Sequence, residues 1–138
     1  MHSRSTQRGQ ILIIVLGAIL LGGAVMAAGV FGTGRSLDDL DKAVKKDIAD
    51  DTRRDAARKV IDQWSTDVKA FLKESGNRQK TVMKLMRRHD ATRPELEAII
   101  AEQELAGAAI DQRAIEHRFA LKEQLSREEW ANLFPARN

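Results

Sequence analysis

The feature that most limits what this chain can fold into is a run of 21 residues, Ile11 to Phe31, without a charged side chain. At about 1.5 Å of rise per residue, a helix of this length measures roughly 31 Å and matches the hydrocarbon core of a bilayer. Arg4 and Arg8 precede the run and no acidic residue does, which places the N-terminus in the cytoplasm. We therefore expect a cytoplasmic tip (residues 1–10) and one transmembrane helix (residues 11–31).

A cleaved signal peptide is the alternative interpretation of this run. Val25-Met26-Ala27, followed by Ala28, has the small residues of a cleavage site. The apolar region is longer than the usual stretch of about 7–15 residues in a signal peptide, which favours an uncleaved anchor. In a bacterium with two membranes, the expected location is the inner (cytoplasmic) membrane, single-pass, with the C-terminal domain in the periplasm.

Beyond a hinge at residues 32–36, an extracytoplasmic all-α domain is predicted over residues 37–138. Aromatic content is only 4%, with no Tyr, which argues against a β-sandwich or barrel, and apolar residues recur at helical spacing. We expect one long helix over about residues 37–75, weak at residues 50–55, which lack apolar anchors, and ended by Gly76-Asn77. A shorter helix is expected over about residues 78–90.

Two capping boxes predict where the remaining helices begin. Thr92 is followed by Glu95 three residues later, and Ser126 is followed by Glu129 at the same spacing. The expected helices cover about residues 92–124 and 126–134. The predicted architecture is thus an antiparallel hairpin of two long helices with two short additional helices.

Charge is unevenly distributed along the chain, although the net charge is only +3. Residues 78–93 contain six basic side chains against one acidic, whereas residues 94–138 contain five basic against nine acidic. Such segments can neutralise each other within the fold or between subunits. A nucleic-acid partner is not expected, because no aromatic side chains interleave with the basic ones. The predicted periplasmic location of the domain also argues against contact with nucleic acid.

The sequence offers no recognisable catalytic motif and contains no Cys, so we expect no enzymatic activity, no catalytic residue and no cofactor. Met83, Met86 and His89 have a spacing that would suit a soft cation such as Cu(I), with His117 approaching from across the hairpin. Methionine at helical spacing is more often core filling, and two adjacent Arg side chains would repel a cation. We therefore predict no metal site.

The C-terminal segment from Arg118 to Trp130 resembles the end of the periplasmic heavy-metal-resistance and LTxxQ families, which include CnrX/ZraP-like sensors and Spy/CpxP-like chaperones. Leu125-Ser126-Arg127-Glu128-Glu129 is similar to their LTPEQ-type element at a helix start, and Ala91-Thr92-Arg93-Pro94-Glu95 has a related form. The resemblance implies a membrane-tethered sensor or chaperone-like helical hairpin, with a homodimer as one expected assembly. The His-rich segments of the sensors are missing here, so no metal ligands carry over.

The expected function is that of a non-enzymatic, membrane-anchored periplasmic protein that binds protein partners, sensor- or chaperone-like in a stress or metal response. Its binding surface is predicted on the concave or apolar side of the hairpin. The large side chains available as anchors there are Trp64, Phe71, Phe119, Trp130 and Phe134.

An alternative function is that of a small accessory or assembly subunit of a larger membrane complex. In that case the anchor helix would be the main contact, because small residues four apart permit close helix–helix approach in lipid. These residues are Ala18, Gly22, Gly23 and Ala27. A pseudopilin-like filament subunit is disfavoured, since the acidic residue expected early in the apolar helix of such subunits is missing.

Overall fold

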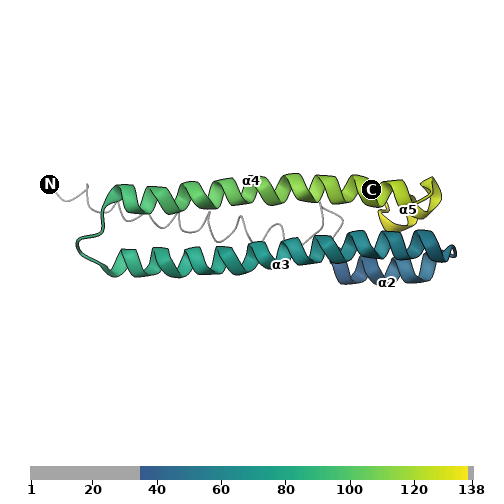
Figure 1. The fold of residues 1–138 in the computed structure, drawn as a ribbon, viewed down its shortest axis with the longest axis horizontal. Helices are drawn as coiled ribbons and strands as arrows, with labels where there is room; N and C mark the ends of the chain where they lie inside the picture. The colour runs from purple at the N-terminus through teal and green to yellow at the C-terminus, as the bar shows by residue number, and fades with distance from the viewer. Residues whose placement is uncertain (1–34, 137–138) are drawn as a thin grey trace.

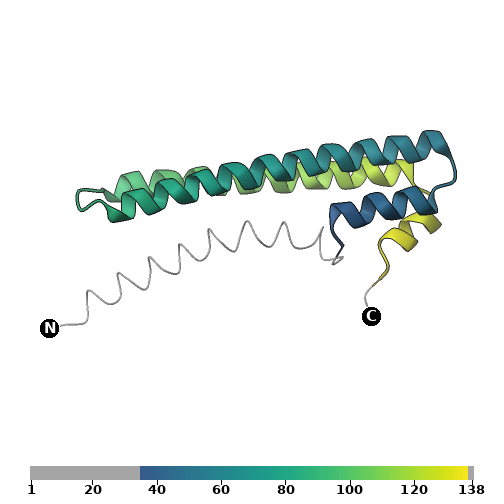
Figure 2. The ribbon, with the colours of Figure 1, turned by 90° about the horizontal axis from the view of Figure 1, so that it is seen from below.

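The computed structural model describes residues 35–136, which form four α-helices and no strand. The two long helices, α3 (Asp51–Arg87) and α4 (Arg93–Gln124), run antiparallel, joined by a short turn (Figure 1). The two short helices, α2 (Leu37–Asp47) and α5 (Arg127–Leu133), lie together at the end of the hairpin away from this turn (Figures 1 and 2). The all-α prediction is therefore confirmed.

The predicted membrane helix over residues 11–31 and the cytoplasmic tip lie outside the described residues, as does most of the hinge. Within residues 35–136, no helix combines the length and the apolar character needed to cross a bilayer.

The prediction of one helix over residues 37–75 is wrong, because the chain leaves helical geometry at residues 48–50 between α2 and α3. Asp50 is the N-cap of α3 and its carboxylate accepts a hydrogen bond from the Arg53 backbone N–H at 2.7 Å. Ile48, which ends α2 as its C-cap, is 1% exposed and belongs to the core. The break lets α2 fold back along α3, where the Arg58 guanidinium lies 2.8 Å from the Asp41 carboxylate.

The predicted stop at Gly76-Asn77 is also wrong, because α3 continues through both residues to Arg87. A glycine inside a helix costs only about 1 kcal/mol relative to alanine. Phe71 and Val82, on either side of Gly76 in the sequence, are both buried. Their packing stabilises the helix across this glycine. The separate helix expected over residues 78–90 is therefore the C-terminal part of α3.

The two predicted capping boxes do mark helix starts. At α5, Ser126 Oγ accepts from the Glu129 backbone N–H at 3.1 Å, and the Glu129 carboxylate accepts from the Ser126 N–H at 2.7 Å. At α4, the Glu95 carboxylate accepts from the Thr92 N–H at 2.8 Å. Each box satisfies N–H groups that have no partner inside the helix.

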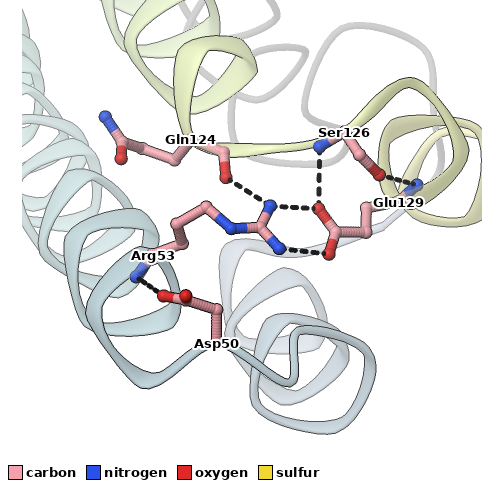
Figure 3. A network of polar contacts seen from close by, with 5 residues as sticks. All are labelled: Asp50, Arg53, Gln124, Ser126 and Glu129. Atoms are coloured by element: carbon pink, nitrogen blue, oxygen red, sulfur yellow. Dashed lines mark hydrogen bonds and ion pairs between the residues drawn. The ribbon is translucent and has the colours of Figure 1, made fainter.

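One arginine connects the start of α3 with the end of α4 and with α5 (Figure 3). The Arg53 guanidinium forms a bidentate ion pair with the Glu129 carboxylate, with N–O distances of 2.8 and 3.0 Å. It also donates a hydrogen bond to the Gln124 carbonyl at 3.3 Å. Arg53 lies in the first turn of α3, Gln124 is the last residue of α4, and Glu129 is in α5. This network fixes α5 against the hairpin and lowers the pKa of the Glu129 carboxyl through its hydrogen bonds with Arg53 and Ser126.

The hydrophobic core is concentrated at the end of the hairpin that carries the short helices. We call residues 35–68 and 110–136 the base, and residues 69–109, which contain the turn, the arm. One cluster of buried residues draws on all four helices and lies entirely in the base. Its members are Leu40, Val44, Ile48, Ala57, Ile61, Trp64, Ala114, Leu121 and Leu133.

Candidate functional site

The α4 helix is apolar on two opposite faces. Its inner face packs on α3 through Ile110, Ala114 and Leu121, which are at most 5% exposed. On its outer face Leu105 is 73% exposed and Phe119 is 59% exposed. A solvent-facing helix surface is normally polar, so this outer face is the feature of the fold that local packing does not account for.

The outer apolar residues form one continuous line, which we call the α4 row. Successive members of the row lie three or four positions apart, except at one place, where Gln112 stands between two members that are seven positions apart. This spacing puts all of them on one side of the helix. Leu105 comes two residues after the buried Gln103, which places the row roughly 200° around the helix axis from the α3 contact. The α4 row consists of Ala98, Ala101, Leu105, Ala108, Ile115 and Phe119, all exposed.

Acidic residues border the α4 row on both sides. Glu104 and Asp111 follow one edge, while Glu102, Glu116 and Glu123 follow the other. Two cations lie at the C-terminal end of the row. Lys122 Nζ is 5.8 Å from the ring centroid of Phe119, whereas the Arg118 guanidinium is turned toward α5, 5.0 Å from the ring centroids of both Trp130 and Phe134.

Of the five candidate aromatic anchors, only Phe119 lies on the α4 row. Trp64 and Phe71 are buried, at 2% and 9% exposure. Trp130 and Phe134 pack against the core, with their ring centroids 4.4 Å apart. These four side chains therefore belong to the packing of the fold, and Phe119 is the one candidate anchor that is exposed. The predicted binding surface stays a prediction.

A second feature is a polar cluster between α3 and α4, centred on Asp67. The Asp67 carboxylate lies 2.8 Å from His117 Nε2 and 3.0 Å from the Arg113 guanidinium. These contacts, the hydrogen bond from His117 foremost, lower the pKa of the Asp67 carboxyl. The His117 ring also stacks on Trp64, with centroids 5.9 Å apart. Asp67 thus anchors two side chains of α4 onto α3.

An open groove of about 200 Å³ runs beside this cluster along the seam of the hairpin. Its floor is largely apolar, from Phe71, Ala106 and Ile110, and its rim carries Glu74 and Arg78. Further toward the turn, the half-buried Arg78 side chain donates to the Gln103 side-chain oxygen at 3.3 Å. The volume of this groove is smaller than the volumes of about 300–1,000 Å³ that are typical of pockets for small ligands.

The residues considered for a metal site are not brought together. Met83, Met86 and His89 are exposed near the turn. His117 lies 24 residues along α4 from Arg93, which corresponds to about 36 Å of helix, and it is paired with Asp67. Residues 35–136 contain no group of three or more His, Cys, Asp or Glu side chains arranged to hold a metal ion. The predicted absence of a metal site stays a prediction.

Comparison with known protein families, characterised proteins and solved structures found no match. The resemblance of the C-terminal segment to the LTxxQ and heavy-metal-resistance families rests on the sequence elements alone. In the structure, both elements are helix starts.

Proposed function

We propose that this chain is a non-enzymatic, membrane-anchored protein whose helical domain binds protein partners through the α4 row. The observation that supports a binding role is the exposure of Leu105, Ile115 and Phe119 along the outside of a helix that already packs on α3 through its other face. Apolar side chains gathered on an exposed helix face are typical of protein–protein contact.

The sensor- or chaperone-like role belongs to the same proposal and agrees with an open hairpin whose apolar surface is accessible along its length. Anchoring in the inner membrane through residues 11–31 would hold this surface on the periplasmic side. The uncharged span and the preceding Arg4 and Arg8 support that arrangement.

Site-specific photo-crosslinking in intact cells tests the proposal. A photoreactive residue at Leu105 or Ala108 on the α4 row is expected to give protein adducts, while the same residue at the exposed Gln63 of α3 gives none. Adducts formed only from positions within residues 11–31 would contradict this function and support the accessory-subunit role instead. Failure to obtain any adduct from the α4 row would equally count against it.

A further inference from the structure

The arm carries a second exposed apolar line, which lies on α3 and is bordered by cations. Leu72 is 39% exposed, Met83 39% and Met86 40%. With Gly76 and Gln79 between them, these residues are spaced by four and three along the helix, so they share one side of α3. We call this line the α3 row; its members are Leu72, Gly76, Gln79, Met83 and Met86.

Four exposed cations border the α3 row, namely Lys73, Lys80, Lys84 and Arg87. None of the four forms an ion pair with another residue of the 35–136 range. Other basic residues of this region, Arg78 and Arg88, are paired with acids. The α3 row is therefore a strip of three exposed apolar side chains, interrupted by Gly76 and the polar Gln79, with unneutralised positive charge along one edge.

The α4 row is the complement of this strip in both respects. It is apolar at a similar helical spacing. Four of its five bordering acids, Glu104, Asp111, Glu116 and Glu123, are likewise without an ion pair inside the described part of the chain. Two α4 rows facing each other would set acid against acid, and two α3 rows would set cation against cation. Only an α3 row facing an α4 row sets cations against acids while it buries the apolar side chains of both rows.

We propose that the partner of the α4 row is the α3 row of a second copy of this chain. This inference rests on the proposed function, since it names the occupant of the same surface. A single molecule cannot make the contact internally, because the α4 row points away from α3.

The directions of the two rows determine what kind of assembly results. Leu72 and Met83 each follow a buried residue, Phe71 and Val82, by one position, so the α3 row lies roughly 100° from the seam. The α4 row lies roughly 200° from its own seam residue. Because the rows face different directions, one neighbour cannot engage both at once. The contact is head-to-tail, and each copy bound on one side keeps a free row on the other.

Charge reversal of each row in the full-length chain, purified in a non-ionic detergent, tests this pairing. One variant carries Lys80→Glu, Lys84→Glu and Arg87→Glu, and the other carries Glu104→Lys, Asp111→Lys and Glu123→Lys. Capture of an untagged copy by a tagged copy is measured for every combination. We expect each variant to capture itself at least about tenfold less than wild type does, because like charges then border both rows.

A mixture of the two variants is expected to recover capture, because unlike charges border the rows in each mixed pair. Wild-type capture should also weaken in about 1 M salt, where charges are screened within about 3 Å. A matched control, Lys59→Glu with Asp62→Lys, reverses exposed charges of α3 in the base and should behave as wild type.

Three results would overturn the head-to-tail contact. They are undiminished self-capture by the α3-reversed variant, failure of the mixture to recover capture, and equal capture in all combinations, which would indicate association through residues 11–31. Helical circular dichroism and melting temperature, unchanged in both variants, establish that the fold is retained. If crosslinks from Leu105 reach a different protein while the charge-swap pattern is absent, the proposed function stands and the self-pairing fails.

Discussion

The base and the arm of the hairpin are made from the same two helices but are held together differently. In the base, α2 and α5 add their side chains to the seam between α3 and α4, and nine hydrophobic residues are buried in one cluster. In the arm the buried residues are Phe71, Val82 and the polar Gln103. The arm has only two helices, so each turns most of its circumference to solvent.

Because of this difference, the base provides most of the stability, while the arm presents most of the exposed apolar side chains. The free energy of folding comes mainly from the base, where burial is greatest, since hydrophobic stabilisation scales with the apolar area removed from water. Within residues 35–136, four of the six large exposed hydrophobic side chains belong to the arm, namely Leu72, Met83, Met86 and Leu105. A thin two-helix arm can present apolar side chains on both of its outer surfaces without disturbing the core that keeps the chain folded.

The largest expected effect on stability is that of removing a core aromatic from the base. Trp64→Ala should lower the free energy of unfolding by about 3–5 kcal/mol, as is typical for a buried aromatic. Val82→Ala in the arm removes two methyl groups and should cost about 1.5 kcal/mol. Urea unfolding of both variants, followed by circular dichroism, measures the contrast. Equal losses would show that the arm contributes as much to stability as the base.

A smaller, pH-dependent effect is expected at the network that holds α5 to the base. Glu129→Gln should cost about 1 kcal/mol at neutral pH, because a charge-assisted contact with Arg53 becomes a neutral one. Folding lowers the pKa of Glu129 below its ordinary value of 4.5, so the stabilisation is fully present above that pH. It is lost as the pH falls through the lowered pKa of the folded state, and the gap between wild type and variant should close there.

Unfolding free energies measured from pH 7 down to pH 3 test this expectation. The matched control is Glu128→Gln on the same helix, whose side chain is exposed and makes no hydrogen bond within residues 35–136. A gap of constant size across the pH range would mean that the charge of Glu129 does not contribute.

The smallest expected effect is a gain in stability in the arm. Gly76 lies inside α3, and a Cβ atom added there would meet nothing within 4 Å. Gly76→Ala should therefore raise the free energy of unfolding by about 0.5–1 kcal/mol through helix propensity alone. Gly107→Ala, at an equally open position of α4, provides a parallel measurement. A loss of stability in either variant would indicate that the glycine is needed for close approach by another chain.

Sequence reasoning located helix starts well where a side chain signals them locally. Ser126 with Glu129 and Thr92 with Glu95 were sufficient to place the beginnings of α5 and α4. The break before α3 was not predicted: the weak point was placed at residues 50–55, whereas the chain leaves helical geometry at residues 48–50 and is helical again from Asp51. Asp50 stands among other acidic residues, and nothing local shows that Ile48 is needed in the core. The stop expected at Gly76 failed because packing on both sides outweighs a cost of about 1 kcal/mol.

The candidate site was accessible to sequence reasoning only in part. The apolar residues of α4, Leu105, Ile115 and Phe119 among them, are visible as a helical pattern. Apolar residues also occupy the opposite side of the same helix, so the pattern alone does not indicate which side meets α3. The buried Trp64 and the exposed Phe119 look equivalent in the sequence, and only the packing of α2 and α5 in the base separates them.

The contact between Arg35 and Leu133 has a mechanical consequence, because it lies between the two ends of the described chain. The Arg35 guanidinium donates to the Leu133 carbonyl at 3.2 Å, so the first and last parts of the described chain meet at the base. Tension applied between residues 35 and 136 would therefore act across this one contact and the packing of α2 on α5. The arm lies outside the path of this tension, because α3 carries its turn about 54 Å along the helix from Asp51.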